Sequence, residues 1–241
     1  MNDDAGWVIQ PHVRASLVVR GSAKRFAIHR IYCVGRNFAD HAREMGHAAP
    51  ASPEERGTPV FFSKPADVVV TGEATAAIPY PRETADLHHE VELVLALGRD
   101  SDGVIAREDA ASMIFGHAVG IDLTRRDLQA LAKANGLPWD TAKGFDASAP
   151  ISELVPLSVA TPQETALLQL EVNGDLRQSA PLSDMIFDVA DVLHHLSRFY
   201  NMRAGDLVFM GTPAGVAALQ RGDRFIARVE GLVELNGAIA D

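Results

Sequence analysis

The most regular alternation of apolar and polar positions runs through residues 87–97. Every second residue from 91 to 97 is valine or leucine, which predicts a β-strand because successive side chains of a strand point to opposite faces. The other face carries Val94 and Ala96 beside Glu90 and Glu92. Since both faces bear apolar residues, this strand is expected to be buried on both sides.

Shorter apolar runs that end in turn-forming residues predict the remaining strands. They cover residues 17–19, 26–28, 32–34, 60–63, 118–123, 167–172, 176–178, 207–210 and 225–235. Gly21-Ser22 and Asn173-Gly174 lie between neighbouring runs and predict two hairpins.

Helical spacing is less frequent along the chain. The segment 37–40 has the pattern of a capping box and predicts a short helix ending at Met45. Further helices are expected over 107–115, from Thr124 to Gly136 and, with one apolar face, over 189–200. Because helices do not alternate regularly with the strands, an α+β, mainly β fold is predicted. Its core would be an antiparallel or mixed sandwich with peripheral helices, rather than a doubly wound sheet.

No linker, charge block or repeat divides the 241 residues, so one domain is expected. The segment 47–57 is rich in Ala, Pro, Ser and Glu and has no apolar periodicity, which predicts a mobile loop that can act as a lid.

The chain is acidic, with 32 acidic against 22 basic residues and a formal net charge of -10. This balance excludes a basic nucleic-acid surface and disfavours binding to anionic membranes. The sequence shows neither a signal peptide nor an apolar stretch of the ~20 residues that span a membrane, so a cytoplasmic protein is expected. The single cysteine, Cys33, fits a reducing compartment and is interpreted as a buried structural residue.

Candidate chemistry begins with Glu90-Val91-Glu92. Residues i and i+2 of a strand share a face, so two carboxylates project together and repel each other unless a cation lies between them. A solvated edge strand is the ordinary explanation of such a pair, but the apolar surroundings disfavour it because unpaired buried carboxylates are costly. Oxygen ligands favour magnesium, manganese or calcium. His88 and His89 leave a softer metal open, although alternation directs His89 away from Glu90.

A second candidate is the pair His41 and Glu44, three residues apart on the predicted short helix. There a carboxylate can orient an imidazole that takes a proton from water, beside a loop that could close over the site. An exposed helix with unrelated polar residues would show the same spacing. His194 and His195, on an amphipathic helix without nearby acids, are interpreted as structural or surface residues.

Four turns place a cation, a hydroxyl or a free amide after an apolar run, as anion-binding sites require. They contain Arg36, Lys64, Lys143 and Gly211-Thr212. The sequence contains neither GxGxxG nor GxxxxGK[ST], which removes the dinucleotide and nucleoside-triphosphate functions.

Taken in order, these motifs resemble the fumarylacetoacetate hydrolase family, in its single-domain acylpyruvase and fumarylpyruvate hydrolase branch. The resemblance covers about residues 31–235. It rests on Tyr32-Cys33-Val34-Gly35-Arg36-Asn37-Phe38, His41-Ala42-Arg43-Glu44-Met45, Leu87-His88-His89-Glu90-Val91-Glu92-Leu93, Gly120-Ile121-Asp122-Leu123-Thr124, Arg126-Asp127, Leu137-Pro138-Trp139, Lys143 and Gly211-Thr212-Pro213. Residues 1–15 follow no part of the pattern and are interpreted as an N-terminal extension of a single catalytic domain, 16–241.

The resemblance implies a metal site and its surroundings. Glu90, Glu92 and Asp122 would bind Mg²⁺ or Mn²⁺, with Ca²⁺ also compatible with oxygen ligands. The residues that would surround the substrate are Arg36, Lys64, Arg126, Gln129, Lys143, Gly211 and Thr212. The resemblance further implies a β-sandwich or β-roll core and a homodimer.

The implied reaction is hydrolysis of a carbon–carbon bond in a small 2,4-diketo acid, such as fumarylpyruvate or another acylpyruvate, in aromatic-compound catabolism. The ion would stabilise the departing pyruvate enolate, His41 with Glu44 would activate water, Lys143 would hold anionic oxygens and the 211–212 turn would donate to the oxyanion. Two other functions remain open. The first is an enzyme on the same scaffold that decarboxylates oxaloacetate, or that isomerises or decarboxylates a diacid; decarboxylation needs no activated water. The second is a metal-stabilised binding protein without turnover.

Overall fold

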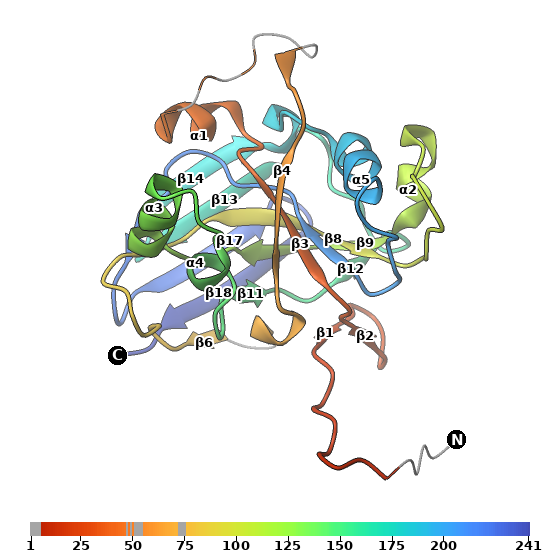
Figure 1. Cartoon of the computed structure of the whole chain (residues 1–241), viewed down its shortest axis with the longest axis horizontal. Helices are drawn as coiled ribbons and strands as arrows, with labels where there is room; N and C mark the ends of the chain where they lie inside the picture. Colours follow the sequence, from red (N-terminus) through yellow and green to blue (C-terminus); the bar gives the residue numbers. More distant parts are fainter. Residues whose placement is uncertain (1–5, 47, 49, 51–54, 72–75) are drawn as a thin grey trace.

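Strands make up most of the regular structure in the computed structural model, which describes residues 6–46, 48, 50, 55–71 and 76–241 (Figure 1). The largest sheet has eight strands. In spatial order they are β4 (Val60–Lys64), β3 (Ile31–Gly35), β15 (Leu207–Phe209), β8 (Val91–Leu97), β9 (Ile114–Ile121), β11 (Ala149–Ile151) and β5 (Val69–Thr71), with β12 (Val155–Pro156) also paired to β9. The strand β8 pairs with β9 on one side and β15 on the other, and it is buried at every position because apolar clusters cover both of its faces.

A five-stranded sheet forms the second layer. Its order is β14 (Asp175–Pro181), β13 (Leu167–Val172), β17 (Arg224–Val229), β18 (Val233–Ile239) and β6 (Ala76–Ile78). The hairpin predicted around Asn173-Gly174 is confirmed: both residues have positive φ angles, 54° and 87°, as the favoured two-residue hairpin turn requires.

Two smaller sheets complete the strands. The order in the three-stranded sheet is β10 (Thr124–Arg125), β7 (Leu87–His88) and β16 (Ala218–Leu219), and the predicted N-terminal hairpin is β1 (Ser16–Val18) with β2 (Arg25–Ala27). The strand expected over 87–97 is therefore two strands. The chain leaves the three-stranded sheet after His88 and enters the large sheet at Val91, so Glu90 lies in the break between β7 and β8.

Helices are short and lie at the periphery. They are α1 (Ala39–Glu44), α2 (Ala110–Met113), α3 (Arg126–Ala134), α4 (Asp140–Lys143) and α5 (Val189–Ser197), with 3-10 turns at Ala66–Val68, Arg107–Asp109 and Leu182–Asp184. In Figure 1, α1, α3 and α4 lie on one side of the molecule and α2 and α5 on the other. In the described part of the chain, no helix has the length and apolar character needed to cross a membrane.

The core lies mainly between the two large sheets. One apolar cluster joins Val91, Leu93 and Leu95 of β8 to the inward residues of β13, β17 and β18. A second cluster covers the opposite face of the large sheet and includes Cys33 and Val94. The predicted mainly β class is confirmed, and so is the burial of Cys33.

Three helix predictions were wrong in detail. The capping box before α1 does not form, because the Asn37 side chain is buried and bonds elsewhere: its Nδ2 donates to the carbonyls of Phe187 and Met210, and its Oδ1 accepts from the Phe187 amide. The helix expected over 107–115 is only a 3-10 turn and one α-helical turn, since residues from Ile114 onward pair with β8. The helix expected over 189–200 ends at Ser197. The expected lid, 47–57, falls largely on residues 47, 49 and 51–54, which lie outside the described residues.

Candidate metal and substrate site

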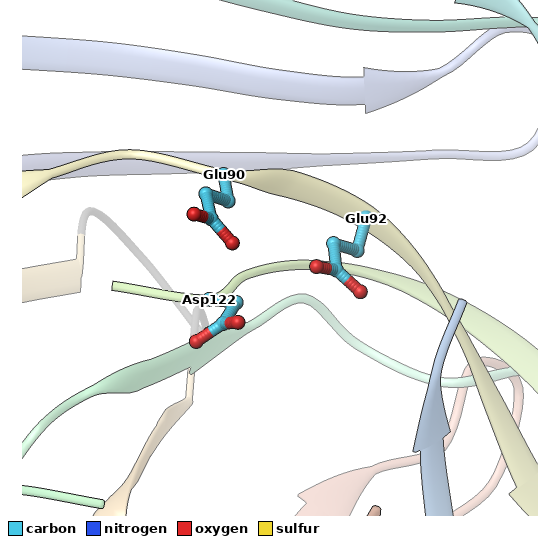
Figure 2. A group of neighbouring side chains, drawn as sticks. All are labelled: Glu90, Glu92 and Asp122. Carbon is cyan, nitrogen blue, oxygen red and sulfur yellow. The ribbon is translucent and has the colours of Figure 1, made fainter. Parts of the chain in front are cut away.

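Three carboxylates meet where β8 and β9 lie side by side. Glu92 is on β8, Glu90 directly precedes it, and Asp122 directly follows β9. The Asp122 amide donates to the Glu90 carbonyl oxygen at 2.8 Å, which holds the two backbones together. Figure 2 shows the three side chains pointing toward a common centre. The pair seen in the sequence and the third acid from a separate strand thus form one group.

The chemistry of this group fits a hard divalent cation. One carboxylate oxygen from each residue can be chosen so that all lie within 4.8 Å of one another, and the exposed fractions are 6%, 2% and 0% for Glu90, Glu92 and Asp122. All three donors are oxygens, which suit magnesium, manganese or calcium better than zinc.

Lys143, at the end of α4, reaches directly into the acidic group. Its Nζ lies 2.8 Å from Glu90 Oε2, 2.6 Å from Asp122 Oδ2 and 2.7 Å from Thr124 Oγ1. Burial works against the charge of this lysine, but Asp122 and Glu90 outweigh it and raise its pKa above the usual value. Lys143 is therefore a buried, charged ammonium group in direct contact with two of the candidate ligands.

The structure places Lys64 behind the triad rather than in the cavity beside it. Its Nζ lies 2.8 Å from Asp122 Oδ1 and donates to the carbonyl oxygens of Leu123, Lys143 and Ser148. Because these partners occupy the ammonium group fully, Lys64 orients Asp122 and the turn around it.

The three carboxylates differ in their electrostatic surroundings. Burial opposes ionisation of Glu90, but the charges of Lys143 and Arg126 lower its pKa below the usual range. Burial, together with the neighbouring charges of Asp122 and Glu90, raises the pKa of Glu92. Glu92 is therefore the carboxylate whose charge is least compensated by the protein, which is where an added cation would contribute most.

Arg126 links the triad to helix α3. Its guanidinium donates to Glu90 Oε1 and to Gln129 Oε1, at 2.5 Å each. Its Nε lies 3.4 Å from His88 Nδ1, and His88 Nε2 lies 2.8 Å from Asp86 Oδ1. The amide oxygen of Gln129 is therefore taken by Arg126, while its amide nitrogen forms no hydrogen bond within the described residues.

The turn at Gly211-Thr212 borders the cavity at the triad. The Gly211 amide donates to Glu92 Oε2 at 2.6 Å, so this N–H holds a triad carboxylate rather than facing the cavity. The Thr212 hydroxyl accepts from Gln178 Nε2 at 2.8 Å, and the same nitrogen donates to the Pro213 carbonyl. Because Thr212 Oγ1 accepts this bond, its own proton is available for another acceptor.

His41 and Glu44 lie on α1, beside the triad. The His41 Nδ1 is 3.2 Å from Glu44 Oε2, and the Glu44 carboxylate also accepts from the Gly215 amide at 3.1 and 3.3 Å. His41 is 5% exposed and lines the same cavity as Glu90 and Glu92. The spacing found in the sequence thus corresponds to an oriented imidazole in the site, not to an exposed helix face.

The cavity at the triad is narrow, about 30 Å³. Its lining includes Arg36, Lys133, Thr212 and two aromatic residues, Phe62 and Trp139. The ring centroids of Phe62 and Trp139 lie 5.9 Å apart. The same two aromatic residues also line a second cavity of about 340 Å³.

Sequence reasoning missed three residues of this site. Gln178 on β14 gave no signal, because a single glutamine in a strand shows no partner in the sequence. His88 was considered as a ligand of a softer metal, but its link to Arg126 was missed because it depends on the pairing of β7 with β10. Lys133 could have been found, since it lies seven residues after Arg126 and four after Gln129 on one helix face.

Fold and site together define a mainly β protein with three buried carboxylates that can hold a metal ion and an adjacent histidine–glutamate pair. The model of the fumarylacetoacetate (FAA) hydrolase C-terminal family matches residues 30–240. The chain belongs to this family.

The relatives of the chain include proteins with different activities. Fumarylpyruvate hydrolase of Ralstonia sp is 39% identical, over 80% of this chain and 96% of that protein. The mitochondrial oxaloacetate tautomerase FAHD1 of Arabidopsis thaliana is 40% identical, over 86% of this chain and 88% of that protein. Among solved structures, fumarylpyruvate hydrolase from Pseudomonas aeruginosa in complex with Mn²⁺ and pyruvate has 42% sequence identity and a TM-score of 0.91, covering 98% of this chain and 99% of that one.

Proposed function

We propose that this protein hydrolyses the carbon–carbon bond of a 2,4-diketo acid, an acylpyruvate, to pyruvate and a carboxylic acid. Water adds to the C4 carbonyl carbon and the bond between C3 and C4 breaks. Its electron pair passes to the pyruvate half as an enolate, which takes up a proton at C3. The observation that supports this proposal is that His41, hydrogen-bonded to Glu44, lines one cavity with Glu90 and Glu92 of the triad.

The triad and its neighbours would hold the pyruvate end. Glu90, Glu92 and Asp122 would hold Mg²⁺ or Mn²⁺, which when bound supplies a Lewis acid for the carboxylate, the 2-keto oxygen and the developing enolate. Lys143 adds a second positive charge at this end. The Gln129 amide nitrogen would donate to the carboxylate, while Lys64 keeps Asp122 in place.

The residues that would activate water lie on α1. His41 would take the proton of the attacking water, and Glu44 would hold the imidazole in one tautomer and stabilise its charged form. The Thr212 hydroxyl, whose oxygen already accepts from Gln178, would donate its proton to the oxyanion that forms at C4. The Gly211 amide is engaged with Glu92, so the turn would contribute one donor and not two.

Loss of the diketo-acid ultraviolet absorbance tests the proposal. The purified protein, loaded with Mn²⁺ or Mg²⁺, should consume fumarylpyruvate or acetylpyruvate and release pyruvate in equal amount, and EDTA should stop the reaction. Absorbance that is stable with either metal would contradict the proposal.

A second candidate is conversion of oxaloacetate, because a relative of similar identity is an oxaloacetate tautomerase. Decarboxylation would need the cation but no activated water. Keto–enol exchange of oxaloacetate, or its release of carbon dioxide, without cleavage of any diketo acid would favour this function. Ligand binding without any turnover would leave only a metal-stabilised binding protein.

We further propose that residues 16–241 form the catalytic unit and that it assembles as a homodimer in the cytoplasm. The family match over residues 30–240 and the single buried cysteine support the domain and the compartment. Light scattering after size exclusion would measure the mass, and a 25.9 kDa species would contradict the dimer.

A further inference from the structure

A cavity of about 670 Å³ lies on the side of the molecule that carries α2 and α5 (Figure 1). We call it the α2–α5 cavity. Its buried lining residues include Leu93 of β8 and His117 of β9, and among the described residues it shares none with the cavity at the triad. Its volume falls in the range of about 300–1,000 Å³ that is usual for small-molecule sites.

The inner lining of the α2–α5 cavity is mainly apolar. Ile114, Met185 and Val189 pack against the main core and also line the cavity, and all three are only half-buried. Covering such surface with an apolar ligand is favourable because it removes that surface from water. A flexible methionine in the lining can adapt to the shape of the ligand.

His117 is the polar group inside this apolar lining. It is 5% exposed, and its imidazole ring forms no hydrogen bond within the described residues. Burial lowers the pKa of His117 to about 4, so the ring is uncharged at neutral pH. A buried polar group without a partner is costly, so a ligand that supplies a hydrogen bond here gains free energy.

The rim of the cavity disfavours charged ligands. Its cation, Arg107, already pairs with Asp188 at 3.1 Å and with Asp191. Glu164 adds a negative charge at the rim, which opposes the entry of an anion. A cation would lose its hydration against the apolar lining, which is unfavourable.

We infer that the α2–α5 cavity binds an uncharged apolar molecule with one hydroxyl group, such as a phenol, whose hydroxyl is hydrogen-bonded to His117. A hydroxyl group both donates and accepts, so it fits either tautomer of the neutral imidazole. Binding here does not depend on the proposed function, because the cavity contains none of the residues assigned to the metal, the substrate or water.

Equilibrium dialysis with 2-naphthol and 2-methylnaphthalene tests the inference. The two compounds have nearly the same shape and are uncharged at pH 7, but only 2-naphthol carries a hydroxyl group. Wild type should bind 2-naphthol about tenfold or more tightly, which corresponds to ~1.4 kcal/mol. His117→Phe keeps an aromatic ring without nitrogens and should bind both compounds equally. No binding, equal affinity in wild type, or an unchanged preference in His117→Phe would overturn the inference.

A pair of tryptophan variants on α2 tests the location. Ala111 lines the cavity, whereas Ser112, the next residue of the helix, does not. Both positions are exposed, so both variants should fold even if His117→Phe does not. Ala111→Trp should weaken binding of both compounds about tenfold or more, and Ser112→Trp should leave it within about twofold. Unchanged affinity in Ala111→Trp would overturn the inference.

Nitrogen NMR of protein labelled with ¹⁵N-histidine tests the hydrogen bond itself. The ring signals of His117 are identified by their loss in His117→Phe. They should shift when 2-naphthol is added and shift much less with 2-methylnaphthalene. A 2-naphthol shift confined to His41 would place the compound in the cavity at the triad and overturn the inference.

Discussion

Gln178 offers the sharpest test of how the site is held together. It lies on β14 and is 1% exposed. Its Oε1 accepts from His89 Nδ1 at 2.8 Å and from the Val91 amide at 3.2 Å, while its Nε2 donates to Thr212 and to the Pro213 carbonyl. One side chain thus ties the break between β7 and β8 to the turn that closes the cavity. Gln178→Leu keeps a similar volume and removes all four bonds.

The size of the stability loss in Gln178→Leu follows from the groups that lose their hydrogen-bond partners. The His89 N–H, the Val91 N–H and the Pro213 carbonyl become buried without a hydrogen bond, whereas the Thr212 hydroxyl can rotate to another acceptor. Each unsatisfied buried group costs about 1–3 kcal/mol. For three groups the expected loss in the free energy of unfolding is therefore roughly 3–9 kcal/mol, a large share of the 5–15 kcal/mol that is usual for a domain.

Urea unfolding followed by fluorescence, at constant m, measures this loss. Gln169→Leu on neighbouring β13 is the control, since Gln169 donates one exposed bond, to Ser179, and its loss should change stability by less than about 1 kcal/mol. Because Thr212 also loses its positioning donor, kcat should fall even where the variant is fully folded. A Gln178→Leu protein as stable as the control would refute the reasoning.

Three further predictions concern the metal, the base and the pH. Glu90→Gln should abolish both Mn²⁺ binding in calorimetry and the rise in unfolding free energy that Mn²⁺ gives wild type, which is ~2.7 kcal/mol at 100 times Kd. His41→Asn should bind Mn²⁺ normally but lower kcat by ~10²–10⁴, and an unchanged kcat would rule out His41 as the base. Burial lowers the pKa of His117 to about 4. Between about pH 6.5 and pH 4 the unfolded chain therefore binds a proton that the folded state does not. As the pH is lowered through this range, the free energy of unfolding should fall by up to ~1.4 kcal/mol per pH unit. Urea titrations from pH 7 to 4.5 should show a shallower fall in His117→Gln.

The parts of the structure that were predicted correctly depend on short-range patterns. The alternation through β8 and the Asn173-Gly174 turn follow from backbone geometry over a few residues, whereas Glu90 points to the same site as Glu92 from outside the strand. The i, i+3 spacing of His41 and Glu44 is equally local. These features survive because the tertiary structure agrees with the local preference at each of them.

The errors arose where distant segments decide the local structure. Asn37 would cap a helix in isolation, but its side chain satisfies the backbone of residues 150 and 173 positions away. Residues from Ile114 onward form a strand because β8 offers a pairing edge. The contacts of Gln178 and Lys64 likewise join segments far apart in the chain, which no spacing rule reveals.

The break before Val91 explains how one short motif holds two different carboxylates. Glu92 is fixed by β8 and receives the Gly211 amide, while Glu90 lies outside the strand and meets Arg126 and Lys143. The carboxylates of the site therefore rest on buried strands and their junctions, and helices α3 and α4 supply the cations that contact Glu90. The group assigned to water, His41, comes instead from helix α1. Substitution of His41 should therefore change the rate while the metal affinity stays constant, which separates the two parts of the site experimentally.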